Sequence, residues 1–85
     1  MNNLNEIKEK LFNNFTNKDL TIILEGNITT DFIIRNAKIS ISNKRIMLSD
    51  GNKTELIICI DNIINTYICN YIELSFEKQK IIIDY

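Results

Sequence analysis

The chain has 85 residues, of which 45% are hydrophobic and 25% charged, and it contains neither proline nor histidine. This length predicts one domain, residues 1–85, that buries roughly 60 to 65% of its unfolded surface in a single core. The formal net charge of -1 provides no overall field to attract nucleic acid, so we expect no nucleic-acid partner. The polar first residues and the absence of a long apolar run predict no membrane segment and a location in the cytoplasm, including that of a host cell.

The residue types that carry most enzyme chemistry are missing. Without histidine, the commonest general base and metal ligand are absent, and a serine triad or a cysteine-imidazole pair cannot be assembled. The two glycines, Gly26 and Gly51, are too few for a phosphate-binding loop, and the carboxylates do not fit an EF-hand. We therefore expect a non-catalytic binding protein with no catalytic residues, no metal ligands and no cofactor.

The start of the chain has helical periodicity. Apolar residues recur at spacings of three and four, at Leu4, Ile7, Leu11 and Phe15. Asn3 followed by Glu6 has the form of a capping box. The pattern predicts an amphipathic helix over residues 4–15, with its apolar side on a sheet of the same molecule.

From residue 20 onwards the apolar period is two, which is typical of strands. Two strands are expected over residues 20–35 around a turn at Gly26, and the apolar parity then shifts at Asn36, which predicts a bulge or bend. The clearest alternation covers residues 38–60, at Ile39, Ile41, Ile46, Leu48, Leu56, Ile58 and Ile60. The pair Asp50-Gly51 predicts a tight hairpin within it.

The last third of the chain continues the strand pattern. Residues 56–60 are all apolar, which predicts a strand covered on both faces, and residues 63–69 favour another strand. A final hairpin is expected over residues 72–85. Cys59 and Cys69 lie in apolar surroundings without C-x-x-C spacing, so we expect two reduced, buried thiols.

These patterns predict an α+β fold. One N-terminal amphipathic helix packs on an antiparallel, strongly bent sheet or a partly open barrel of five to seven short strands. The last strand has three consecutive isoleucines and ends at Tyr85; as an edge strand it would expose apolar side chains and unpaired backbone groups. We therefore expect a homodimer formed through the C-terminal strand.

Two groups of residues are predicted to bind a protein partner. The first consists of acidic side chains at strand ends and turns that we expect to converge on one side: Glu25, Asp31, Asp50, Glu55 and Asp61. The second belongs to the C-terminal strand and consists of Ile82 and Tyr85.

One stretch resembles a known family. Residues 17–26 read N-K-D-L-T-I-I-L-E-G, followed by I-T and then I-I-R up to Arg35, after a short amphipathic helix. This order resembles the first half of small phage-encoded anti-CRISPR proteins that inhibit Cas9. The resemblance implies a small α+β inhibitor that occupies the nucleic-acid-recognition surface of a CRISPR effector. The acidic clusters of DNA mimics are missing, so we expect a phage or mobile-element inhibitor that acts by steric blocking.

Two other functions remain open from the sequence. A helix followed by about five short strands, with Leu24-Glu25-Gly26 at the end of the first strand, is also similar to Sm-like and Hfq-like RNA-binding proteins. A structural accessory protein that forms homo-oligomers is the other alternative. An RNA-binding ring is expected to elute as a hexamer or heptamer that retains RNA, whereas a monomer or dimer free of RNA would exclude it.

Overall fold

The computed structural model describes residues 4–85, beginning with helix α1 (Leu4–Lys10), which continues as a π-helical segment (Leu11–Phe15). These bounds confirm the helix predicted over residues 4–15, whereas Asn3 of the predicted capping box lies outside the described residues. The helix is followed by Asn17 with a φ of 65°, a left-handed conformation that prevents further helical turns.

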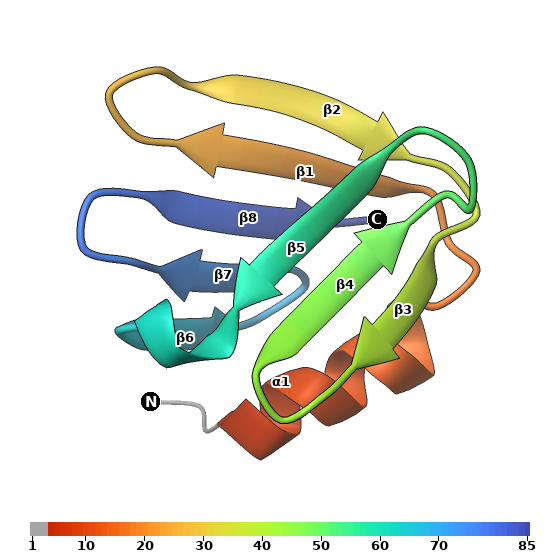
Figure 1. Cartoon of the computed structure of the whole chain (residues 1–85), viewed down its shortest axis with the longest axis horizontal. Coiled ribbons are helices and arrows are strands. Elements are labelled where there is room, and N and C mark those ends of the chain that lie inside the picture. Colours follow the sequence, from red (N-terminus) through yellow and green to blue (C-terminus); the bar gives the residue numbers. More distant parts are fainter. Residues whose placement is uncertain (1–3) are drawn as a thin grey trace.

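Eight strands, counted within residues 4–85, form two antiparallel sheets (Figure 1). The larger sheet has the order β2 (Thr30–Ile34), β1 (Leu20–Glu25), β8 (Lys80–Asp84), β7 (Ile72–Ser75), β6 (Asn65–Ile68). The smaller sheet has the order β3 (Lys38–Ile41), β4 (Arg45–Ser49), β5 (Glu55–Cys59). The predicted α+β class, N-terminal helix and antiparallel pairing are confirmed. The sheets do not close into a barrel, and the eight strands within residues 4–85 exceed the predicted five to seven.

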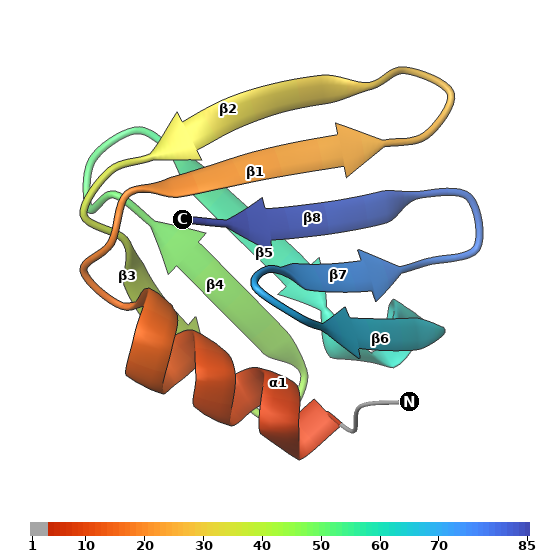
Figure 2. The same ribbon diagram turned by 180° about the vertical axis from the view of Figure 1, so that it is seen from behind.

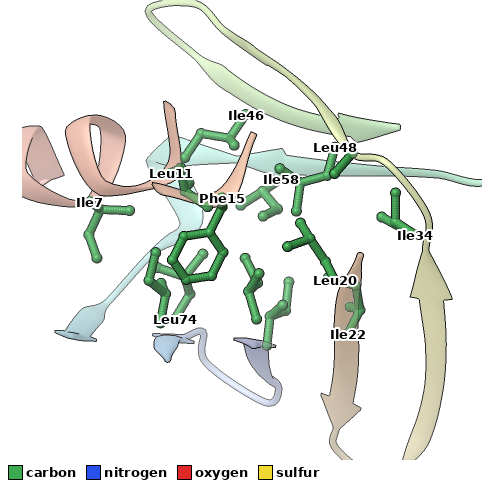
Figure 3. Close-up of a cluster of buried hydrophobic side chains, with 14 of the residues drawn as sticks. Ile7, Leu11, Phe15, Leu20, Ile22, Ile34, Ile46, Leu48, Ile58 and Leu74 are labelled. Atoms are coloured by element: carbon green, nitrogen blue, oxygen red, sulfur yellow. The ribbon is translucent and has the colours of Figure 1, made fainter. Parts of the chain in front are cut away.

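One hydrophobic core lies between the two sheets and the helix (Figure 3). The helix and six of the described strands supply buried residues from one side, as the apolar periodicity predicted, while β3 and β6 supply partly buried ones. The helix contributes Ile7, Leu11 and Phe15, the smaller sheet Ile46, Leu48 and Ile58, and the larger sheet Leu20, Ile22, Ile34, Ile72, Leu74, Ile81 and Ile83. Burying one such side chain contributes about 1.5–3 kcal/mol to stability. The strand and helix periodicities therefore stabilise the fold by placing apolar side chains in this one layer.

The parity shift at Asn36 marks the place where the chain passes from the larger sheet to the smaller one. Asn36 has a φ of 49°, and its N–H donates a 2.9 Å hydrogen bond to Oδ1 of Asp19. The N–H of Ala37 donates to the carbonyl of Lys18 (2.9 Å), and the carbonyl of Ala37 accepts from the N–H of Asn17 (2.8 Å). These bonds fix the crossover against the segment that joins the helix to β1.

The predicted central hairpin is confirmed as β4 and β5, but its loop is wider than a two-residue turn. Ser49 pairs with Glu55, which leaves residues 50–54 in the loop, and Gly51 adopts a φ of 79°. Oδ1 of Asp50 accepts hydrogen bonds from the N–H of Asn52 (2.8 Å) and the N–H of Thr54 (3.1 Å). The Asp50 carboxylate therefore accepts hydrogen bonds from loop N–H groups that a two-residue turn would pair with backbone carbonyls.

The prediction that the C-terminal strand is an edge strand is wrong. β8 lies between β1 and β7, with Ile82 opposite Ile23 on one side and Glu73 on the other. Both edges of β8 are therefore occupied, and a homodimer cannot form by strand addition at this position. The three isoleucines are accommodated because Ile81 and Ile83 face the core while Ile82 faces outward.

Two burial predictions for the second half are also wrong. Residues 56–60 are covered on one face only, because Ile58 packs in the core while Ile57 is 50% exposed on the other side. Cys59 and Cys69 are free thiols as predicted, but both are exposed. Cys59 points away from the core because its neighbour Ile58 points into it, and Cys69 lies past the end of β6.

The remaining elements follow the prediction. A 3-10 turn (Ile60–Asn62) separates β5 from β6, β6 is the strand favoured for residues 63–69, and β7 and β8 form the final hairpin. Within residues 4–85, no helix has the length and apolarity needed to cross a membrane.

Candidate protein-binding face

The larger sheet has one face on the core and one face turned away from it, which is seen in Figure 2 without another element in front of it. Successive side chains of a strand point to opposite faces, so the residues between the core positions form this outer face. The outer face consists of Thr21, Ile23, Glu25, Asp31, Ile33, Asn65, Tyr67, Glu73, Ser75, Lys80, Ile82 and Asp84.

The middle of the outer face is apolar. Ile23 of β1 lies directly opposite Ile82 of β8, and both side chains are half-buried by their neighbours. Ile33 lies on the edge strand β2 and Tyr67 on the edge strand β6, and each is 49% exposed. Apolar side chains on β1, β8 and both edge strands, interrupted at β7 by Glu73, provide the kind of contact surface found in the centre of protein interfaces.

Acidic side chains surround these apolar residues. The outer face carries four carboxylates, at Glu25, Asp31, Glu73 and Asp84, and one ammonium group, at Lys80. Nζ of Lys80 lies 3.7 Å from Oε2 of Glu73. Four negative charges against one positive charge give these strand residues a formal charge of -3 in a chain whose total is -1, and Arg35, directly after β2, adds one positive charge at the margin of the face. The other seven carboxylates of the chain are accompanied by nine basic residues, so the outer face is more negative than the rest of the chain.

Tyr67 remains neutral at physiological pH. A hydrogen bond with the Cys69 side chain raises the pKa of Tyr67 above its ordinary value, and negative charge nearby, including that of Glu73, acts in the same direction. The Tyr67 ring also lies beside that of Tyr71, with centroids 6.1 Å apart. The phenol is thus an uncharged polar group at the β6 edge, available to a partner as an aromatic contact.

The structure brings together three of the seven residues predicted to bind a partner. Glu25, Asp31 and Ile82 all belong to the outer face, with Asp31 opposite Ile23 and Ile82 on the next strand. The expected convergence of all five acidic residues does not occur. Asp50 and Glu55 lie at the β4–β5 hairpin of the smaller sheet, and Asp61 lies in the 3-10 turn after β5.

Tyr85 is separate from the outer face. It follows β8, and its ring makes an edge contact with the ring of Phe15 in the helix, with centroids 4.7 Å apart and planes at 78°. Nζ of Lys18 lies 5.8 Å from the centroid of the Tyr85 ring. The Tyr85 ring thus lies beside the end of the helix, with 54% of the residue exposed, and its predicted role in partner binding stays a prediction.

Sequence reasoning missed several members of the outer face, namely Ile23, Ile33, Tyr67, Glu73 and Asp84. The alternation in residues 72–76 already placed Glu73 on the side opposite to Leu74. The alternation did not show that β8 lies between β7 and β1. This strand order brings the separate residues together on one surface.

The described residues offer no metal site, since no group of three or more cysteine and carboxylate side chains within residues 4–85 is arranged to hold an ion. The same part of the chain has no buried polar or charged side chain. Comparison of the sequence and structure with protein-family models, with curated proteins and with solved structures found no match.

Proposed function

We propose that this protein is a non-catalytic binding module that covers a functional surface of a protein partner with its outer face. The observation that supports this function is the apolar pair Ile23 and Ile82 in the middle of a face surrounded by carboxylates. Protein interfaces combine an apolar, well-packed centre with a polar rim in the same way.

The charge of the outer face favours a basic partner surface. Carboxylates at the rim attract lysine and arginine side chains, which increases the association rate and excludes acidic partners. Surfaces that bind nucleic acid are rich in those residues because they contact phosphates. A protein that covers such a surface blocks access to nucleic acid without itself resembling a nucleic acid.

We propose a CRISPR-Cas effector in the cytoplasm of a host cell as the partner, and a phage or mobile element as the source of the inhibitor. The sequence stretch that resembles anti-CRISPR proteins, residues 17–35, folds as β1 and β2. These strands supply two of the five strands of the outer face, including Ile23 and Ile33. The stretch that carries the resemblance is therefore also part of the proposed binding surface.

The first experiment compares two pairs of charge reversals of equal size. Glu25→Lys with Asp84→Lys changes the outer face, and Glu55→Lys with Asp61→Lys changes exposed positions away from it. We expect the first pair to weaken binding to the purified effector at least about tenfold and the second pair to change it less than about twofold. Isothermal titration calorimetry measures both, and restoration of phage infection in a CRISPR-immune host reports inhibition.

Ile82→Ser tests the apolar centre. If steric covering is correct, this variant loses inhibition although the charge of the outer face is unchanged, and circular dichroism verifies that it remains folded. The proposal is wrong if the wild-type protein restores infection against no effector type. Equal losses from both reversal pairs would also contradict it, because binding would then not depend on the outer face.

A further inference from the structure

One edge of the larger sheet is open. β2 is the last strand on its side, and no other strand within residues 4–85 pairs with its outward edge (Figures 1 and 2). The helix lies elsewhere, in contact with the edge strands β3 and β6. An uncovered edge strand presents backbone N–H and C=O groups that can pair with a strand of another chain.

The side chains of β2 are self-complementary around Ile33. Ile33 is 49% exposed; Asp31 lies two residues before it in β2, and Arg35 lies two residues after it, in the turn that directly follows β2, and both are exposed. Within the described part of the chain, neither Asp31 nor Arg35 forms an ion pair. A cavity of about 470 Å³ beside the edge is lined by these three residues together with Thr21 and Phe32. The edge therefore has an apolar residue in the middle, with a negative charge two residues before it and a positive charge two residues after it.

We propose that two copies of this chain associate through β2, antiparallel and around a two-fold axis at Ile33. In this register Ile33 faces Ile33 of the second copy, and each Asp31 lies opposite an Arg35 of the other copy. On the inner side Phe32 lies opposite Ile34, so the apolar row continues across the junction. The two five-stranded sheets join into one sheet of ten strands with a continuous outer face.

Charge complementarity selects this register among the neighbouring ones. A two-fold axis at Asp31 would place two carboxylates directly opposite each other, which is unfavourable in an antiparallel pair. An axis at Phe32 would place Asp31 opposite Ile33, and an axis at Ile34 would place Arg35 opposite Ile33. Only the axis at Ile33 pairs both charges of both copies, and the symmetry forms each ion pair twice.

The association differs from a dimer through the C-terminal strand and does not depend on the proposed function. It uses Asp31, Ile33 and Arg35 at one edge, and it leaves Ile82 and Glu73 in the middle of the outer face uncovered. A dimer presents two such faces to its partner, side by side and related by symmetry.

Sedimentation equilibrium from micromolar to millimolar concentration tests the proposal with a charge swap. We expect the wild-type protein to dimerise, and Asp31→Arg and Arg35→Asp each to raise the dissociation constant more than about tenfold, because each puts two like-charged pairs in the interface. The double variant restores opposite charges, so its dissociation constant returns to within about threefold of wild type. Glu25→Lys with Asp84→Lys serves as a control that leaves dimerisation intact.

A wild-type protein that stays monomeric throughout the concentration range would overturn the proposal. A dimer insensitive to the single reversals, or one that the double swap does not restore, would place the interface elsewhere and overturn it as well. Circular dichroism of each variant separates loss of association from loss of folding. Effector binding by a protein that remains monomeric would leave the proposed function standing, so the two hypotheses fail independently.

Discussion

Asp50 links the charge state of a single carboxyl group to the stability of the β4–β5 hairpin. The backbone N–H of Asn52, together with the backbone and side chain of Thr54, lowers the pKa of Asp50 below its ordinary value of 3.8. The folded protein therefore favours the ionised form. Its contribution to stability is fully present above the unfolded-state pKa and is lost as the pH falls through the lower folded-state pKa.

We expect Asp50→Asn to lower the melting temperature at pH 7, because the amide replaces a charged acceptor by a neutral one. The difference from wild type should shrink as the pH is reduced through and below 3.8. Thermal unfolding followed by circular dichroism at a series of pH values measures it. Asp61→Asn, at an exposed position in the 3-10 turn, is the control. A difference that stays constant down to pH 2 would show that the charge of Asp50 is irrelevant.

The two thiols give a second test at the level of single residues. Because Cys59 and Cys69 are free and exposed, we expect a water-soluble thiol reagent to label both in the folded protein, in the absence of denaturant. Absorbance of the released chromophore counts them, and Cys59→Ala should halve the count. Labelling that requires denaturant would mean that the thiols are buried, as the apolar sequence around them suggested.

At the level of elements, the helix contains two neighbouring residues with opposite environments. Leu11 is fully buried in the core, whereas Phe12 is 60% exposed. We expect Leu11→Ala to reduce the free energy of unfolding by about 2–5 kcal/mol, because it leaves a cavity between the sheets. Phe12→Ala should change it by less than about 0.5 kcal/mol. Urea denaturation measures both, and a larger loss from Phe12→Ala would place the helix in a different rotation on the core.

The strands show which structural features a sequence pattern can predict. Alternation from residue 38 to residue 60 identified the inward side chains of β3, β4 and β5 correctly, because the face of a side chain depends only on its position within its own strand. The parity shift at Asn36 was visible too, but a local pattern records only that the face changes. It does not show that the chain has moved to a second sheet.

Strand neighbours are a property of the whole molecule, and here the sequence was insufficient. Pairing of β1 with β8 joins residues from opposite ends of the chain, and no local pattern specifies it. The prediction therefore found Glu25, Asp31 and Ile82 but not that they share a face with Glu73. The net charge of -1 likewise gave no sign of that face, since a sum over the chain does not record where the charges lie.

The central position of β8 also determines when the protein can fold during its synthesis. The β1–β2 hairpin leaves the ribosome early, yet β1 completes its pairing only when Asp84 has emerged and can meet Thr21. Until then β1 lacks its second neighbouring strand, and the apolar side chains of the β1–β2 hairpin are not covered. Chaperones and proteases recognise such exposed strand edges and apolar surfaces. The larger sheet can thus be completed only after β8 has been synthesised, because β8 connects the β1–β2 pair to the β6–β7 pair.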